Sequence, residues 1–221
     1  MPTALIIGAS RGIGLELARQ YKAAGWRVIA TGRTEKDCKK LAAMECHAYQ
    51  LDVNSAESIG ALGWNLDDEK LDVAFYNAGA FGPRDSFPTQ EQFDLVMHTN
   101  VYAAMRILPV IAPLVCHAKG TLAVLSSHMG SIAGRSASNA TLYRASKAAL
   151  NSVLADTAVE YGPQGATCIA FHPGWVKTDM GGPGAELEVD VSVAGMRTTL
   201  AGLSIADNGK FLNYDGAPLP W

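Results

Sequence analysis

Paired cysteines, long apolar segments and an excess of either charge are all missing from this chain of 221 residues. The four cysteines are scattered without a CxxC pair, which is typical of reduced thiols and not of a disulfide framework or a zinc site. No uninterrupted apolar run reaches the roughly 18 residues of a membrane span, and the first residues lack the basic start of a signal peptide. We therefore expect a cytoplasmic protein that holds no metal and spans no membrane.

Charge is also scarce, because only 18% of the residues are charged and the formal net charge is −3. Such a chain has no general attraction to a phosphate backbone, so nucleic acid is not an expected partner. Hydrophobic residues make up 48% of the chain, which excludes a disordered chain or a coiled coil. Glycine is abundant, with 22 residues, so either turns are frequent or some glycines let the backbone approach a ligand.

Short apolar runs alternate with longer segments of helical periodicity. The runs that we expect to be strands are residues 4–7, 27–30, 46–51, 71–76, 121–125 and 167–171, and the helical segments begin near residues 15, 35, 55, 90, 139 and 191. This alternation predicts an α/β fold, a doubly wound (Rossmann-type), mostly parallel sheet of about seven strands with helices on both faces. No linker or repeat interrupts the pattern, so we expect a single domain over residues 1–221 that carries both the cofactor and substrate sites.

A glycine-rich segment, Gly8-Ala9-Ser10-Arg11-Gly12-Ile13-Gly14, lies between the first predicted strand and the first helix. In this context Gly8 permits a tight exit from the strand, Gly12 lets the backbone approach a diphosphate, and Gly14 lets the helix pack against the sheet. The helix N-terminus offers free N–H groups and a positive dipole end. Three glycines alone are a weak signal, but their position between strand and helix predicts a nucleotide-binding loop.

The end of the second predicted strand indicates which dinucleotide binds. An acidic residue there would accept hydrogen bonds from a ribose 2′-hydroxyl, but none occurs before Glu35. Arg33 could instead bind a 2′-phosphate, and Arg11 in the glycine loop could supply a second positive charge. Each arginine could also be a solvated surface residue. Together they favour NADP(H) over NAD(H).

Tyr143 and Lys147 are four residues apart in a helical segment, so they share one helix face. A phenol titrates near pH 10 and is a poor acid or base at neutral pH, but a neighbouring ammonium lowers its pKa. The pair could therefore donate a proton to a carbonyl oxygen or accept one from an alcohol. A surface tyrosine beside a solvated lysine is the alternative.

Polar residues end the fourth and fifth predicted strands, where α/β sheets bind ligands. Asn77-Ala78-Gly79 follows the fourth strand and Ser126-Ser127 follows the fifth. A serine hydroxyl there can donate a hydrogen bond to a developing alkoxide. Ser127 is not part of a GxSxG elbow, which argues against a hydrolase, and we interpret the adjacent His128 as incidental.

These motifs together resemble the classical short-chain dehydrogenases/reductases over essentially the whole chain. The matching segments, in family order, are Gly8–Gly14, Asp52-Val53, Asn77-Ala78-Gly79, Asn100, Ser126-Ser127, Tyr143-x-x-x-Lys147 and Pro173-Gly174. Each motif is modest, but their ordered combination is very specific. The segment Asn213–Trp221 and the short chain resemble the C-factor/sniffer-like branch of small carbonyl reductases.

The resemblance implies a role for each matching residue. Tyr143 would be the catalytic acid or base, Lys147 would lower its pKa and hold the nicotinamide ribose, and Ser127 would orient the substrate oxygen. Asn100 would hold a water of the proton relay and Asp52 would bind the adenine amino group, with a helix or strand-end hydrogen bond as the alternative for both. The implied cofactor-binding set is Gly8, Ser10, Arg11, Gly12, Ile13, Gly14, Arg33, Asp52, Val53, Asn77, Ala78, Gly79, Tyr143, Lys147, Pro173, Gly174, Val176 and Thr178.

The chain departs from the family pattern in the spacing of the catalytic serine. Ser127 and Tyr143 lie 16 residues apart, farther than is usual in the family, and Ser131 is nearer in count. Ser127 keeps the strand-end context Ser-x-x-Gly, so we retain it and predict an inserted turn near residues 136–139.

A second departure concerns the segment that covers the substrate. Residues 179–188 form a short, glycine-rich stretch where the family usually has a longer helical one. A short lid implies an open pocket and broad carbonyl specificity. Its candidate wall residues are Phe81, Met129, Trp175 and Met180, although such side chains are core residues nearly as often.

The sequence therefore predicts an NADP(H)-dependent oxidoreductase that reduces ketone or aldehyde carbonyls of a small molecule to alcohols. Two alternatives stay open: alcohol oxidation by the same residues, and a cofactor-binding regulatory or signalling protein of C-factor type. Family subunits often pair through the helices that correspond to residues 97–115 and 143–161. This implies a homodimer or homotetramer, although small carbonyl reductases also occur as monomers.

Overall fold

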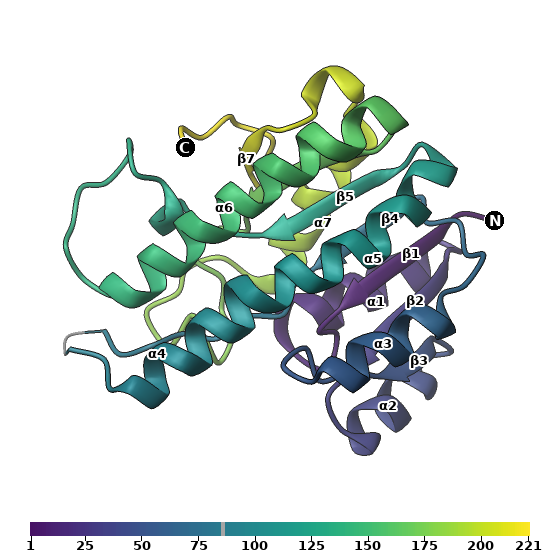
Figure 1. Ribbon diagram of the computed structural model, residues 1–221, viewed down its shortest axis with the longest axis horizontal. Coiled ribbons are helices and arrows are strands. Elements are labelled where there is room, and N and C mark those ends of the chain that lie inside the picture. The colour runs from purple at the N-terminus through teal and green to yellow at the C-terminus, as the bar shows by residue number, and fades with distance from the viewer. Residues whose placement is uncertain (85–86) are drawn as a thin grey trace.

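A single seven-stranded sheet organises the computed structural model, which describes residues 1–84 and 87–221 (Figure 1). All neighbouring strands are parallel, in the order β3-β2-β1-β4-β5-β6-β7. The predicted doubly wound α/β fold is confirmed, and the sheet is wholly rather than mostly parallel. The strands are β1 (Thr3–Ile7), β2 (Arg27–Gly32), β3 (His47–Gln50), β4 (Val73–Tyr76), β5 (Thr121–Leu125), β6 (Thr167–His172) and β7 (Phe211–Asn213).

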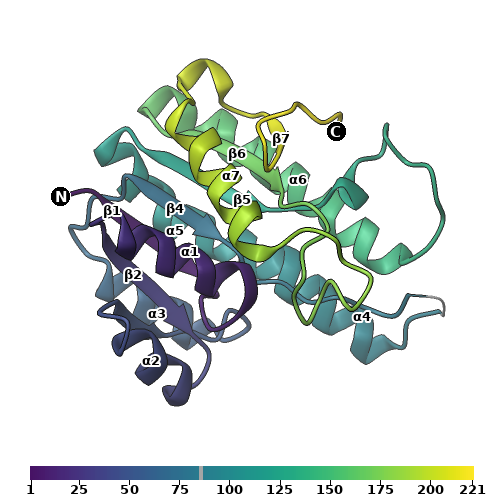
Figure 2. The same ribbon diagram turned by 180° about the vertical axis from the view of Figure 1, so that it is seen from behind.

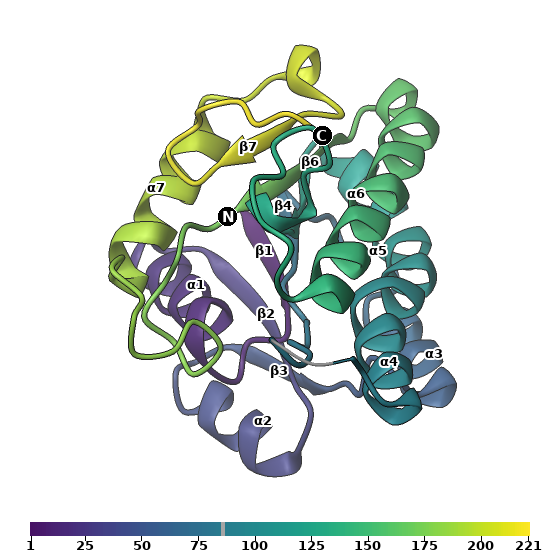
Figure 3. The ribbon, with the colours of Figure 1, turned by 90° about the vertical axis from the view of Figure 1, so that its left-hand side faces the viewer.

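Helices cover both faces of the sheet, as Figures 2 and 3 show. The helices α1, α2 and α7 pack on one face, and α3, α5 and α6 pack on the other, each face with its own apolar core cluster. Strands buried on both faces need apolar side chains at every position, which is why they are continuous apolar runs. The helices are α1 (Gly12–Ala23), α2 (Glu35–Ala42), α3 (Ala56–Asn65), α4 (Gln90–Met97), α5 (Ala103–Ala118), α6 (Thr141–Tyr161) and α7 (Val189–Ala201).

Two details differ from the sequence pattern. The helical pattern from residue 90 onward is interrupted by a π-helical turn, His98–Tyr102, which separates α4 from α5 and contains Asn100. Such turns insert one residue into an otherwise regular helix and leave the side-chain period almost unchanged. The seventh strand, β7, is only three residues long, too short to produce a recognisable period of its own.

The sheet order creates the crevice that such folds use for ligands. From β1 the chain moves outward through β2 to β3 and then returns to place β4 on the other side of β1. Helices on either side of this switch point diverge, and the crevice opens at the carboxyl ends of β1 and β4. The glycine loop and Asn77-Ala78-Gly79 follow these two strands directly.

The continuous helical run Gln90–Ala118 is long and apolar enough, by length and composition alone, to cross a membrane. Ile107, Leu108 and Ile111 of this run are fully buried against the sheet, and core helices of soluble proteins meet the same criterion.

Candidate active site

The glycine loop has the backbone conformation that its sequence predicts. Gly8 and Gly12 have φ angles of +84° and +53°, a region that residues with a side chain rarely adopt. Gly14 lies in the first turn of α1, where a Cβ atom would be 2.1 Å from Gly8 O and 2.5 Å from Asn77 Nδ2. Asn77 donates a hydrogen bond of 2.6 Å to Gly8 O, so the end of β4 holds the loop in place.

The start of α1 is available to an anion. Its N-cap residue, Arg11, is extended and its side chain makes no capping hydrogen bond. The first N–H groups of a helix have no intrahelical acceptor and carry a partial positive charge. The narrow approach at Gly8, Gly12 and Gly14, together with these donors, fits the diphosphate of a dinucleotide.

Basic side chains gather around the end of β2. Arg33 directly follows this strand and is exposed, as predicted for a residue that would bind a 2′-phosphate. Lys40 of α2 donates a hydrogen bond of 3.2 Å to Ser10 O in the glycine loop, and sequence reasoning missed this residue. Arg11 differs from expectation, because its guanidinium Nη1 lies 3.0 Å from Asp179 Oδ2 in the lid.

Asp52 and Val53 follow β3, and the strand-end hydrogen bond considered as an alternative for Asp52 is present. Asp52 Oδ1 accepts a hydrogen bond of 3.0 Å from Asn54 N, while Val53 packs partly against the core. Within the described residues Asp52 Oδ2 has no hydrogen-bond donor, so the carboxylate keeps one oxygen for an adenine amino group.

Tyr143 and Lys147 both face the interior from α6. They are only 7% and 4% exposed, which excludes the alternative of a surface tyrosine beside a solvated lysine. Lys147 Nζ lies 5.7 Å from the centroid of the Tyr143 ring and donates a hydrogen bond of 2.7 Å to Leu125 O. Phe81 packs on the other side of the phenol, with its ring centroid 4.4 Å away.

Burial dominates the proton affinities of this pair. It raises the pKa of Tyr143 to about 12, an effect that an interaction with the Ser127 side chain partly opposes. It also lowers the pKa of Lys147 to about 8. In this structure burial is the largest influence on both pKa values, and the role of Lys147 in lowering the pKa of Tyr143 stays a prediction.

The structure distinguishes between the two candidate serines. Ser127 follows β5, caps a short 3₁₀ turn by accepting a hydrogen bond of 3.2 Å from Met129 N, and faces Tyr143. Ser131 is directed elsewhere, because its hydroxyl donates to Trp221 O at 3.2 Å and accepts from Gly134 N at 2.9 Å. The residues between this 3₁₀ turn and α6 form an irregular loop, whose turn is at residues 133–134 and not at residues 136–139, where an inserted turn was predicted.

Asn100 is fully buried, and its side chain is occupied by the protein. Its Oδ1 accepts from Ala80 N at 2.7 Å, while Nδ2 donates to Ala80 O and to Ser146 Oγ, both at 2.9 Å. Asn100 therefore fixes the loop after β4 beside α6. Both Nδ2 protons are used by these contacts, and the implied role of Asn100 in holding a relay water stays a prediction.

The connection from β6 to α7 starts at Pro173-Gly174, contains the lid (residues 179–188) and is a folded loop. Gly174 has a φ angle of +86°, and a Cβ there would lie 2.5 Å from Leu187 Cδ2. Val176, which is buried, pairs with Leu187 in a parallel bridge that ties the two ends of the lid together. Thr178 Oγ1 accepts a hydrogen bond of 3.2 Å from Gly181 N.

The predicted wall residues of the lid differ in their surroundings. Trp175 is half-exposed and its indole Nε1 donates a hydrogen bond of 2.9 Å to Gly181 O, so its orientation is set by the lid itself. Met180 is also exposed, and Met129 lies partly buried on the turn after Ser127. Beside the lid is an open hollow of about 580 Å³, lined by Lys177, Thr178, Asp179, Gly182 and Pro183.

A histidine pair near the site was not expected from the sequence. His128 Nδ1 and His172 Nε2 are 3.0 Å apart; His172 is the last residue of β6 and His128 begins the 3₁₀ turn after β5. Burial, followed by the charge of His128, lowers the pKa of His172 to about 3, so this imidazole is neutral at pH 7. The sequence signal that could have found the pair is that each histidine lies at or just after the carboxyl end of a strand, β6 for His172 and β5 for His128.

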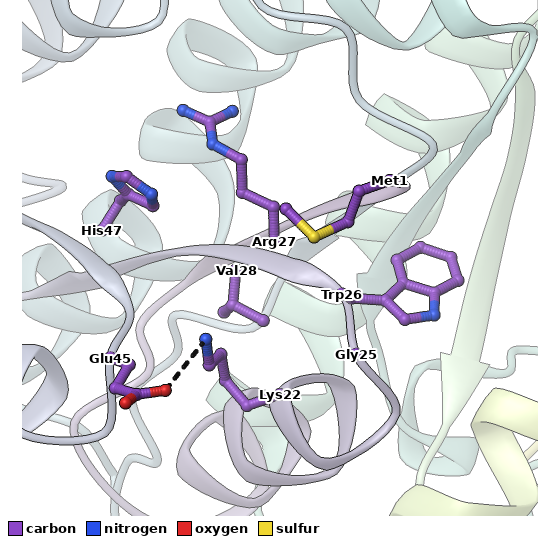
Figure 4. A pocket seen from close by; sticks show the side chains of 8 residues that line it. All are labelled: Met1, Lys22, Gly25, Trp26, Arg27, Val28, Glu45 and His47. Carbon is purple, nitrogen blue, oxygen red and sulfur yellow. Dashed lines mark ion pairs between the residues drawn. The ribbon is translucent and has the colours of Figure 1, made fainter.

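A second cavity lies away from this site, at the amino ends of β1 and β2 (Figure 4). Its volume is about 250 Å³, and Lys22 and Glu45 form an ion pair at its edge. It contains none of the predicted site residues. The lining residues are Met1, Lys22, Gly25, Trp26, Arg27, Val28, Glu45 and His47.

Known proteins resemble this chain over most or all of its length. The family described as short chain dehydrogenase matches residues 2–187. The C-signal protein of Myxococcus xanthus is 34% identical over 164 residues, which cover 73% of this chain and 99% of that protein. The carbonyl reductase Sniffer of D. melanogaster has a TM-score of 0.92 and 30% identity over 100% of both chains. A carbonyl reductase from Pseudomonas aeruginosa PAO1 in complex with NADP has a TM-score of 0.87 and 33% identity, also over 100% of both chains.

Proposed function

Because this chain belongs to the short-chain dehydrogenase family, and within it to the type represented by C-signal and Sniffer, we propose that it reduces ketones or aldehydes to alcohols with NADPH. The observation that carries the proposal is the buried cluster of Ser127, Tyr143 and Lys147 at the carboxyl ends of the strands, on the same sheet as the glycine loop. The similarity to a carbonyl reductase in complex with NADP supports the choice of cofactor.

Different residues around the crevice would bind different parts of NADPH. The loop Gly8–Gly14 would bind the diphosphate and Asp52 the adenine. Arg33, Lys40 and Arg11 would bind the 2′-phosphate. Asn77, Ala78 and Gly79 would line the adenosine side, while Pro173, Gly174, Val176 and Thr178 would hold the nicotinamide. When bound, NADPH supplies the hydride that forms the new C–H bond at the carbonyl carbon.

Tyr143 would supply the proton that completes the alcohol. With a pKa near 12 its phenol is protonated at neutral pH, so Oη can donate to the carbonyl oxygen as that oxygen gains negative charge. The C=O double bond becomes a single bond, its electron pair moves to oxygen, and the phenol proton follows. Ser127 would orient the oxygen by a hydrogen bond from its hydroxyl.

Lys147 would act through its charge. Its ammonium is protonated at pH 7, because its pKa, although lowered, remains near 8. A cation 5.7 Å from the centre of the phenol ring stabilises the phenolate left after proton donation. Asn100 is a positioning residue in this scheme, since it holds the loop that carries Gly79 beside Lys147.

The short lid favours a range of small carbonyl compounds over one tightly enclosed substrate. Trp175, Met129 and Met180 would offer apolar surface to the body of the substrate.

We place the enzyme in the cytoplasm as one domain that acts on small molecules, without nucleic acid or membrane partners. The exposed apolar side chains of Tyr102 and Met105 at the start of α5, and of Val159 on α6, favour a homodimer or homotetramer.

The test is NADPH oxidation by the purified protein with a panel of ketones, quinones, isatins and aldehydes. We expect turnover of several panel members, and a fall in kcat of at least about 100-fold in Tyr143→Phe, because the variant cannot donate the proton. NADPH binding, followed by fluorescence, should be retained in this variant. Turnover by Tyr143→Phe close to that of the unaltered enzyme would refute the assignment.

A second function is favoured by the similarity to C-signal, a protein named for signalling. A cofactor-binding regulatory protein would need the glycine loop but not the catalytic cluster. Tight NADPH binding with no turnover of any panel member would support this second function. The same cluster can also run in the oxidative direction, which NADP⁺ reduction with the corresponding alcohols would detect.

A further inference from the structure

An ion pair joins the glycine loop to the lid across 168 residues of sequence. Arg11 Nη1 lies 3.0 Å from Asp179 Oδ2, and both side chains are largely exposed, at 75% and 78%. The neighbouring residues also approach, because a Cβ at Gly12 would lie 3.3 Å from Thr178 Cγ2. Figure 3 shows the lid beside the N-terminal end of α1. The lid is therefore in contact with the loop that we assign to the diphosphate.

The backbone that precedes Arg11 lies beside the end of β2 and the basic residue Lys40. Ala9 N donates a hydrogen bond of 2.8 Å to Thr31 O, and Lys40 Nζ donates one of 3.2 Å to Ser10 O. These bonds hold the residues before Arg11 against β2 and α2. Within residues 1–84 and 87–221, Arg33 and Lys40 form no ion pair with a carboxylate, whereas Arg11 does. Of these three cations, Arg11 alone is neutralised.

We propose that Asp179 competes with the 2′-phosphate of NADP(H) for Arg11. Asp179 is then a specificity-determining residue of the cofactor site, because it weakens NADP(H) and leaves NAD(H) unaffected. Binding of a 2′-phosphate releases the tip of the lid from the glycine loop, whereas NAD(H) leaves the two joined. The inference rests on the proposed use of NADP(H).

The energies favour an exchange of partners. An exposed ion pair contributes little, because water solvates both charges and two long side chains must be ordered. A phosphate carries more charge than a carboxylate and accepts two parallel hydrogen bonds from a guanidinium. Arg11 should therefore leave Asp179 when a 2′-phosphate lies within its reach.

The rest of the lid should stay folded during this exchange. Its base is held by backbone hydrogen bonds from Lys177 N to Leu187 O at 2.8 Å and from Leu187 N to Trp175 O at 3.1 Å. Neither bond involves the glycine loop. Only the tip, residues 179–184, gains freedom when the ion pair breaks.

The experiment measures affinity without turnover, by calorimetric titration with 2′,5′-ADP and with 5′-AMP, which lacks the 2′-phosphate. We expect Asp179→Asn to bind 2′,5′-ADP about two- to five-fold more tightly and 5′-AMP unchanged, as removal of an exposed ion pair implies. Glu186→Gln is the matched control, because it removes another exposed lid carboxylate that does not contact Arg11. An equal gain in Glu186→Gln would overturn direct competition in favour of a general charge effect.

A double-mutant cycle tests the pairing itself. In the Arg11→Gln background, Asp179→Asn should no longer change the affinity for 2′,5′-ADP, because the guanidinium for which Asp179 and the 2′-phosphate compete is gone. Hydrogen exchange of residues 181–185 should become faster with 2′,5′-ADP but not with 5′-AMP. Unchanged or slower exchange with 2′,5′-ADP would overturn release of the lid.

The binding measurements distinguish a failure of the proposed NADP(H) use from a failure of the competition by Asp179. If the unaltered protein binds neither NADPH nor 2′,5′-ADP, the use of NADP(H) is wrong and the competition fails with it. If both bind but Asp179→Asn binds 2′,5′-ADP no more tightly, only the competition is wrong.

Discussion

At the scale of single residues, burial decides the chemistry of the candidate site. Tyr143 and Lys147 lie within one helical turn of each other, yet each is desolvated by its surroundings, and desolvation always penalises the charged form. The phenol consequently retains its proton and the ammonium loses part of its affinity for one. A neutral phenol beside a lysine that is still charged at pH 7 suits proton donation, which is the reductive direction.

The lowered pKa of Lys147 predicts a loss of activity in mild alkali. The ammonium is present below about pH 8 and absent above it, so kcat/KM for NADPH should fall as pH rises through about 8. Tyr143 keeps its proton throughout this range because its pKa is near 12. Initial rates of carbonyl reduction between pH 6 and pH 10 measure the profile, and a flat profile over that range would contradict the assignment.

The lowered pKa of Lys147 should make the folded protein more stable as pH rises, whereas it should make the enzyme less active. A measurement of stability is therefore the control for the pH profile of activity. The pKa of Lys147 is about 8 in the folded protein and 10.5 as its ordinary value, so between these values the unfolded chain binds more protons. Its contribution to the free energy of unfolding therefore rises with pH across this window. Thermal denaturation should show no loss of folded protein around pH 8 to 9, which separates loss of the charge from unfolding.

At the scale of elements, close packing of α1 against β1 and β4 positions the glycine loop. The contact requires a residue without a side chain at Gly14, because the Gly8 carbonyl and the Asn77 amide occupy the space of a Cβ. The π-helical turn acts similarly on the other side of the crevice, since it contains Asn100, which holds Ala80 at the end of the loop after β4. The amide side chain of Asn77 thus holds the loop after β1, and the amide side chain of Asn100 holds the loop after β4.

Gly14→Ala tests the packing of α1. Its Cβ would lie 2.1 Å from Gly8 O and must displace the backbone, so we expect a loss of about 1–3 kcal/mol in stability and weaker NADPH binding. Denaturant titration and fluorescence titration measure the two effects. Gly60→Ala is the matched control, because Gly60 lies in α3 with nothing within 4 Å of its Cβ position. This change should be neutral or stabilising by up to about 1 kcal/mol, and equal losses in both variants would refute the packing argument.

At the scale of the whole molecule, exposed apolar side chains lie on the helical face formed by α4, α5 and α6. Tyr102 and Met105 are 52% exposed and Val159 is 77% exposed, although the opposite sides of these helices are buried in the core. Exposed apolar groups on one helical layer favour a surface that binds another protein. A second copy of the chain would cover them by the pairing that we propose.

Substitution of this face should change the oligomeric state. We expect Met105→Glu together with Val159→Lys to shift the protein toward monomers in sedimentation velocity experiments, because both charges would be buried in a subunit interface. Trp64→Lys, at an 83% exposed position on α3, is the control for charge on an apolar surface site. An unaltered protein that sediments as a monomer would exclude the proposed dimer or tetramer.

Local pattern in the sequence was sufficient for the order of strands and helices, the glycine loop, and the shared helix face of Tyr143 and Lys147. Each of these depends on residues near one another along the chain, where periodicity and backbone preference act directly. Even the preference for Ser127 followed from its position at a strand end. The parallel sheet then followed from the alternation of strands and helices.

Only the tertiary structure decided which distant groups meet. Arg11 and Asp179 are 168 residues apart, Asn100 and Ser146 are 46, and His128 and His172 are 44, so no local pattern links their positions. The pKa of Tyr143 belongs to the same class, because loss of water depends on everything that packs around the phenol. Sequence order thus determined the elements and their local motifs, while packing determined the charges, the partners and the orientation of the site, because those depend on distance through space rather than along the chain.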